Sequence, residues 1–214
     1  MGQEITEWEN LGLLSGPENV LTVGLQKPEN QPFSGKRLSE IAAAQHKDWR
    51  DAAMDLVLSE HRSVGTIYFM MSEANLALQL RQPWIKIGTD SAGLDPGGAK
   101  GLTHPRSYGT FPRILGEFVR EKRVLPLEEA IRKMTSAPAR RLSIRDRGLL
   151  QPGMFADIVI FDPATVGDQA TYDNPHRMPS GIKYVVVNGM IVMRDGQHTG
   201  AKPGKAVRGP GYAN

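Results

Sequence analysis

The sequence of 214 residues contains no cysteine. Disulfides and thiolate metal sites are therefore excluded, and the redox compartment stays undetermined. No apolar run reaches the roughly 18 residues that a transmembrane helix requires. The first ten residues, MGQEITEWEN, lack the basic and apolar regions of a signal peptide. We therefore expect a cytoplasmic protein with no membrane partner.

Several catalytic motifs are also missing. The five histidines form neither HxH nor HExxH, although a self-contained zinc site needs about three protein ligands. No phosphate-binding GxGxxG or Walker spacing follows a predicted strand, and no G-x-S-x-G nucleophile elbow is present. The sequence alone therefore offers no complete metal, nucleotide or serine-hydrolase site.

The overall composition is that of a soluble globular protein, with 40% hydrophobic and 23% charged residues. The length suits one large domain or two small ones. The net charge is +3, and short basic clusters occur only at residues 120–123 and 140–147. Their helical spacing indicates a solvated face, so we expect no nucleic-acid partner.

Three zones differ in their hydrophobic pattern. Residues 1–62 are predicted to be mostly helical, because apolar residues recur at helical spacing. Residues 63–144 predict a β–α–β–α order, in which strands at 65–70 and 84–88 pair in parallel through a right-handed crossover. Residues 145–214 predict a small antiparallel β module. The expected elements of the three zones are helices at 4–14, 36–45, 49–60, 72–81, 111–122, 127–134 and 136–142, and further strands at 20–23, 155–161, 182–187 and 190–194.

The last zone contains the clearest turn signal. Asn188 and Gly189 stand between two apolar runs, which is the strongest short-range signal for a type I′ hairpin. Asp195 and Gly196 indicate another turn.

Asp90 is the leading candidate for chemistry. It follows the predicted strand 84–88 and begins a glycine-rich loop, and the carboxyl ends of parallel strands are common sites of catalysis. A carboxylate there can ligate a divalent metal and act as a general base. The alternative is an aspartate that caps a helix or turn among Thr89, Ser91 and Gly93.

Arg106 is the second candidate, because a guanidinium can bind a carboxylate through two parallel hydrogen bonds. His104 and Tyr108 flank it and are expected to complete a polar wall around a substrate. The alternative is a surface arginine that pairs with a nearby acid, and Arg113 is expected to have a structural role. The loop after Asp90 is rich in glycine. Such a loop suits either a lid that closes over a substrate or a passive surface loop. The glycines are Gly93, Gly97, Gly98 and Gly101.

Longer strings of residues resemble a known family. TDSAG, HPRSYGTFPRILGEFVRE, LEEAIRKMTSAPARRL, DRGLLQPGMFADIVIFDP and VNGMIVMRDGQHTG resemble N-acyl-D-amino-acid deacylases (D-aminoacylases) of the amidohydrolase superfamily. The earlier segments EWENLGLL, PENVL, GKRLSEIAA and IYFMMSE resemble the same family, so the likeness covers nearly the whole chain.

The resemblance implies an α/β fold, a metal-bearing (β/α)8 barrel accompanied by a small β-sandwich. It implies zinc as the cofactor and an N-acyl-D-amino acid as the substrate. Asp90 would then lie at the zinc as general acid and base, and Arg106 would hold the substrate α-carboxylate. Residues 1–62 would form a helical inserted subdomain, 63–144 the C-terminal part of the barrel with its last two β/α units, and 145–214 the C-terminal part of the β-sandwich.

Several features of the family have no counterpart here. Its HxH, its cysteine ligand, its two further histidine ligands and its YPY segment would all precede the matched region. We therefore expect the C-terminal part of a longer enzyme, in which the other metal ligands come from elsewhere. Two strands cannot close a barrel, and their exposed edges and apolar faces favour pairing with further chain.

Two other interpretations stay open. The chain could be a catalytically incomplete fragment that serves as a structural module, in which exposed strands of two copies pair in a homo-oligomer. It could also be a different metal hydrolase, in which His104 or another local histidine joins Asp90.

Overall fold

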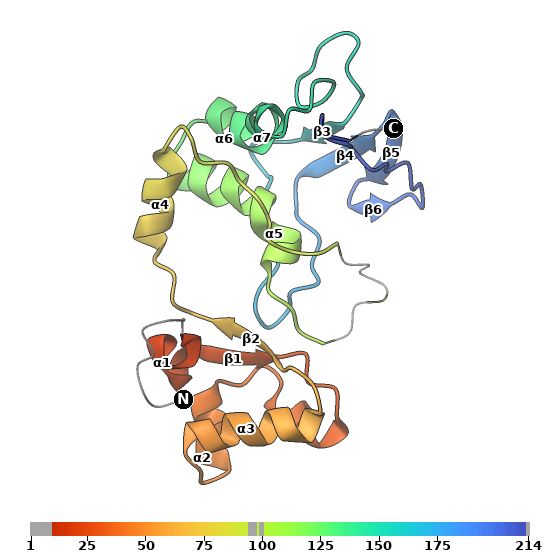
Figure 1. Cartoon of the computed structure of the whole chain (residues 1–214). Coiled ribbons are helices and arrows are strands. Elements are labelled where there is room, and N and C mark those ends of the chain that lie inside the picture. The colour runs from red at the N-terminus through yellow and green to blue at the C-terminus, as the bar shows by residue number, and fades with distance from the viewer. Residues whose placement is uncertain (1–9, 94–97, 99–100, 213–214) are drawn as a thin grey trace. The chain divides into compact units, whose positions relative to one another are not determined.

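The computed structural model describes residues 10–93, 98 and 101–212. Within that part of the chain the contacts define two compact units (Figure 1). The first unit draws on Met1–Glu73, Gly93–Pro105 and Thr171–His176, and the second on Ala74–Ala92, Arg106–Ala170 and Arg177–Asn214. No helix in the described ranges is long and apolar enough to cross a bilayer.

The first unit packs helices around a two-stranded antiparallel sheet. Val20 pairs with Tyr68 and Val23 with Gly65, so β1 and β2 run in opposite directions. Leu38, Ile41 and Ala42 on one helix face are buried, as their spacing predicts. The elements of this unit are α1 (Leu11–Ser15), η1 (Pro17–Asn19), β1 (Val20–Val23), η2 (Pro28–Phe33), α2 (Leu38–Ala44), α3 (Trp49–Glu60) and β2 (Gly65–Tyr68).

A buried carboxylate holds the loop between β1 and α2. Glu60, at the end of α3, is 6% exposed. It accepts hydrogen bonds from Asn30 Nδ2 at 2.7 Å, Gln26 N at 3.0 Å and Lys27 N at 3.2 Å. These donors, with that of Asn30 first, hold the pKa of Glu60 below its usual value, although burial opposes them.

The second unit combines helices with a four-stranded antiparallel sheet in the order β3-β4-β5-β6. Its core joins α4, the π-helix η3 and α6 through apolar side chains such as Leu80, Phe118 and Ala130. The elements are α4 (Glu73–Arg81), α5 (Arg106–Arg113), η3 (Ile114–Glu121), α6 (Leu127–Met134), α7 (Ser136–Arg141), β3 (Ile158–Phe161), β4 (Ile182–Val187), β5 (Met190–Arg194) and β6 (Gln197–His198).

The predicted hairpin is confirmed with the expected bounds. Asn188 and Gly189 link β4 to β5 with φ angles of +47° and +80°, the signature of a type I′ turn. Asp195 and Gly196 form the next turn in the same way, with φ of +45° and +78°. The antiparallel sheet of the last zone is therefore confirmed.

Most predicted helices are confirmed within a few residues, but one helix boundary needs correction. The helix expected over 111–122 begins five residues earlier, because α5 starts at Arg106 and η3 then continues to Glu121. Arg106 and Tyr108 therefore lie on a helix, where the sequence suggested a loop. The helix expected over 4–14 begins outside the described residues, and its described remainder is α1.

The predicted parallel strand pair is wrong. The segment 65–70 supplies β2, which pairs antiparallel with β1. Residues 84–88 belong to no described strand, and Trp84 lies in a turn. Exposure alternates along residues 84–90 as it does along an extended chain, so we call them the extended segment: Ile85 and Ile87 are half-buried, while Trp84 is 66% exposed. A strand is stabilised by ladder hydrogen bonds to a neighbour, and none of the described strands provides one for this segment.

Candidate functional site

Asp90 lies at the end of the extended segment 84–90. Its backbone φ is +47°, in the left-handed region that few non-glycine residues adopt. Such backbone outliers cluster at active sites and ligand clamps, although aspartate also visits this region in turns. This backbone geometry fits both interpretations of Asp90, a functional residue and a turn residue.

Asp90 and Arg106 form an ion pair. Asp90 Oδ2 is 2.9 Å from Arg106 Nη1, and the two side chains are 88% and 44% exposed. Next to them, the hydroxyls of Ser91 and Ser107 are 2.7 Å apart. Asp90, which ends the extended segment, and Ser91, which follows it, therefore meet the first two residues of α5. The structure thus brings together the two residues that the sequence singled out.

The chemistry available to this pair follows from its exposure. An exposed ion pair contributes only about 0–1 kcal/mol to stability, so this pair is a weak constraint on the fold. The carboxylate of Asp90 is open to solvent. A guanidinium beside it can bind a second carboxylate through charge-assisted hydrogen bonds.

The position of α5 depends on the glycine and the second arginine of the string YGTFPR. Gly109 packs directly against the carboxylate of Asp168, so that an added Cβ would collide with it. Arg113, one helical turn later, contacts the same carboxylate at 3.2 Å and Glu117 at 3.5 Å. Arg113 therefore anchors α5 to the loop after β3, in keeping with the structural role expected for it.

His104 and Tyr108 belong to different units. His104 lies in the first, where its ring meets the edge of the Tyr172 ring at a centroid distance of 5.4 Å. Tyr172 in turn contacts Phe69 at 4.7 Å. Tyr108 lies on α5 in the second unit and is half-buried. The joint polar wall expected of the two residues stays a prediction.

Lys133 was missed by the sequence reasoning, which predicted a helix over 127–134 and singled out none of its residues. It is fully buried on α6, at 0% exposure, and burial lowers its pKa against the opposing effect of Glu129. The hydrogen bond to Arg132 holds the pKa of Glu129 below its usual value and raises the pKa of Arg132. A lysine on the inward side of a short amphipathic helix is the sequence signal that could have revealed it.

No metal site is complete in the described part of the chain. No group of three or more histidine, aspartate or glutamate side chains there could hold a metal ion. The expectation that a local histidine completes a site with Asp90 therefore finds no support within those residues. Of the loop glycines, Gly97 lies outside the described residues, while Gly93 and Gly98 are exposed.

Known proteins resemble this chain along most of its length. The model of the amidohydrolase family matches residues 70–193. A D-aminoacylase from Alcaligenes xylosoxydans xylosoxydans is 41% identical over 180 residues, which cover 83% of this chain and 35% of the relative. An N-acyl-D-aspartate deacylase from the same organism is 39% identical over 173 residues, 78% of this chain and 34% of the relative.

The fold is similar as well. The crystal structure of N-acyl-D-glutamate deacylase from Bordetella bronchiseptica, complexed with zinc and a phosphonate mimic of the tetrahedral intermediate, superposes with a TM-score of 0.72. It is 37% identical in sequence, and the match covers 88% of this chain and 38% of that one. The chain thus spans about a third of the length of the curated relatives it matches.

Proposed function

The chain belongs to the amidohydrolase family, and we propose that it is the C-terminal portion of a zinc-dependent enzyme that hydrolyses N-acyl-D-amino acids. The observation that carries the proposal is the Asp90–Arg106 pair. It lies inside the region matched by the family model, and Asp90 has the backbone outlier described above.

Asp90 is the proposed general acid and base. Its carboxylate would accept a proton from the attacking water and then deliver it to the nitrogen of the leaving amine, so that the amide yields a carboxylate and a free D-amino acid. Arg106 would leave its ion pair with Asp90 to bind the α-carboxylate of the substrate. His104 and Tyr108 are the further substrate-binding residues of this proposal.

Zinc does not fit the described residues alone. Asp90 offers one carboxylate, while a catalytic zinc site uses about three protein ligands, and the described residues hold no such group. We therefore assign the remaining ligands to sequence outside this chain. Zinc would supply Lewis-acid chemistry there.

In the whole enzyme the chain would supply three parts of the fold. Residues 1–62 would be the helical inserted subdomain, and 63–144 the C-terminal part of the catalytic barrel with its last two β/α units. Residues 145–214 would belong to the β-sandwich. In this proposal the segment 84–88 becomes a paired barrel strand once the neighbouring strand is present, which its alternating exposure supports.

A chimera tests the proposal. The part of the Alcaligenes D-aminoacylase that precedes its matched region is joined to this chain, and hydrolysis of N-acetyl-D-leucine is measured in the presence of zinc, with the L-enantiomer as control. We expect Asp90→Ala to lower kcat by about 10²–10⁴-fold. Arg106→Ala should raise KM by about 10–100-fold, the value of a hydrogen bond between charged groups.

Two outcomes would count against this assignment. One is a folded, zinc-loaded chimera without D-selective activity, and the other is an Asp90→Ala chimera as active as its parent. The two halves expressed alone serve as controls, and we expect weak or no activity from this chain by itself.

A second candidate function is a structural module without hydrolase activity. The observation that favours it is the exposure of apolar side chains on the sheet of the second unit: Val159 and Ile160 are 53% and 50% exposed. Large exposed apolar surfaces are typical of interfaces. In this function a second copy of the chain covers the apolar surface, in the place that the rest of an enzyme would otherwise take.

A further inference from the structure

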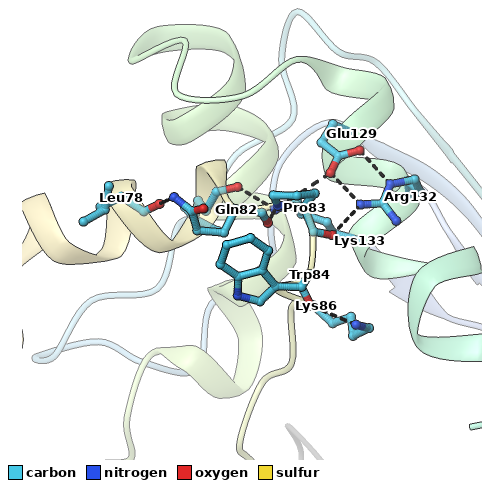
Figure 2. Close-up of polar contacts among 9 residues, drawn as sticks. Leu78, Gln82, Pro83, Trp84, Lys86, Glu129, Arg132 and Lys133 are labelled. Carbon is cyan, nitrogen blue, oxygen red and sulfur yellow. Dashed lines mark hydrogen bonds and ion pairs between the residues drawn. The ribbon is translucent and has the colours of Figure 1, made fainter. Parts of the chain in front are cut away.

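The buried ammonium of Lys133 binds the end of α4 and the turn that follows it. Lys133 Nζ donates a hydrogen bond to the carbonyl of Leu80 at 2.7 Å and another to the carbonyl of Gln82. The last carbonyls of a helix have no partner within the helix, and a cation there also interacts favourably with the helix dipole. Figure 2 shows the side chain of Lys133 among Gln82, Pro83 and Trp84.

The same turn of α6 also binds the residues that follow Gln82 in the sequence. Arg132 Nη2 donates to the carbonyl of Pro83 at 2.8 Å, and the amide of Ile87 donates to the carbonyl of Lys133 at 3.2 Å. Glu129 orients Arg132 through two hydrogen bonds of 2.6 and 2.7 Å (Figure 2). Two adjacent residues of α6 are therefore tied to four points between Leu80 and Ile87.

These bonds matter because the extended segment pairs with no described strand. In a sheet, ladder hydrogen bonds would fix its direction. Here the hydrogen bonds with α6 fix the direction of the segment, and the last of these described above is that of the Ile87 amide. Asp90 lies only three residues further, roughly 10 Å at the rise of an extended chain, and it meets Arg106 at the other end.

We propose that Lys133 is a positioning residue for Asp90, acting through the turn of residues 80–84 that it binds. This inference rests on the function proposed for Asp90. A buried lysine is costly unless its charge is satisfied, and an apolar side chain would fill the space without that cost. A role for the ammonium is to bind the carbonyls of Leu80 and Gln82. These two bonds would fix the direction of the extended segment that leads to Asp90.

The first test uses the chain as it stands. Lys133→Met keeps much of the side-chain length and removes the donors. We expect the amides of Ile85 and Ile87 to exchange with solvent at least about tenfold faster, while those of β4 and β5 are unchanged. Arg120→Met is the matched control, because Arg120 Nη1 also binds backbone carbonyls, those of Pro163 and Val166, but none in the extended segment.

Unchanged exchange at Ile85 and Ile87 in Lys133→Met overturns the proposal, and so does a uniform acceleration across the second unit. If Lys133→Met does not fold, Arg132→Met replaces it, because it removes the bond to Pro83 together with the hydrogen bonds to Glu129 and leaves the ammonium of Lys133 in place. The same local acceleration, smaller in size, is then expected, and its absence rejects the proposal.

The second test separates positioning from mere stability. In an active chimera, Lys133→Met should lower kcat about tenfold or more and leave KM within about twofold, because Asp90 is displaced while Arg106 on α5 is not. Arg120→Met should change neither value. Equal effects of the two variants would identify a purely structural lysine. A folded, zinc-loaded parent chimera without activity would reject the proposed function, while the exchange experiment would still decide whether Lys133 holds the segment.

Discussion

At the scale of single residues, the candidate site combines two kinds of side chain. Some are exposed and can reach a substrate, and one is buried and holds the backbone that leads to the site. Asp90 and Arg106 are exposed and paired, whereas Lys133 is buried and binds two backbone carbonyls and a nearby glutamate. The sequence identified the exposed pair because residue type and the position after an apolar run are local signals. It did not identify Lys133, because burial is a property of the packed structure.

Glu60 leads to a prediction about pH. Its folded pKa lies below its ordinary value of 4.5, so the stability that it contributes is present above that value and is lost as pH falls through the folded pKa. Glu60→Gln should therefore lower the urea midpoint at neutral pH and reduce its change on acidification below pH 4.5, where the contribution of Glu60 is lost.

Urea unfolding followed by tryptophan fluorescence measures this effect. Glu29→Gln, which alters a 61% exposed carboxylate on the same loop, is the matched control and should leave the pH dependence unchanged. If Glu60→Gln kept the full acid sensitivity of the parent, the three hydrogen bonds would not be its source.

At the scale of elements, local turn chemistry was a reliable guide and strand pairing was not. The hairpin of β4 and β5 has the predicted bounds, because Asn188 and Gly189 encode the turn in two residues. The pairing predicted between 65–70 and 84–88 is wrong, because it depended on which strand was available as a neighbour. Helix α5 begins earlier than predicted, and its first residues carry part of the candidate site.

The hairpin turn can be tested by one substitution. Gly189 has a φ of +80°, and an added Cβ would meet no atom within 4 Å, so Gly189→Ala should act through backbone strain alone. We expect a loss of about 1–2 kcal/mol in the free energy of unfolding, measured by urea denaturation.

Gly204→Ala is the control, since a Cβ there also meets open space and its φ lies outside the positive range. It should change stability by less than about 0.5 kcal/mol. Equal stability of the two variants would mean that the turn conformation does not constrain the hairpin.

At the scale of the whole molecule, the chain leaves sheet surface uncovered in its second unit. Adjacent residues of a strand point to opposite faces, so the half-exposed Val159 and Ile160 indicate that both faces of β3 are accessible. β3 is also an edge strand of its sheet, and open edges favour association. An enzyme of the relatives' length offers further chain to cover such surface, since this chain spans about a third of it.

We therefore expect the isolated chain to self-associate, with a sedimentation coefficient that rises with concentration. Ile160→Lys should weaken the association about tenfold or more, because it places a charge on the apolar face. Leu58→Lys, at a 65% exposed position on α3 in the first unit, is the control and should have little effect. A monomer at all concentrations would argue against the structural-module function.

The sequence by itself determined the family, the helices with a clear apolar stripe, the antiparallel hairpin and the identity of the exposed pair Asp90 and Arg106. These depend on residue type and on the conformation of a few neighbouring residues. Only the tertiary structure decided that β2 pairs with β1, that residues 84–88 lack a described partner strand, and that Lys133 binds the turn before them. Those outcomes depend on which distant groups can satisfy a backbone hydrogen bond or a buried charge. The spacing of residues along the chain does not identify these distant partners.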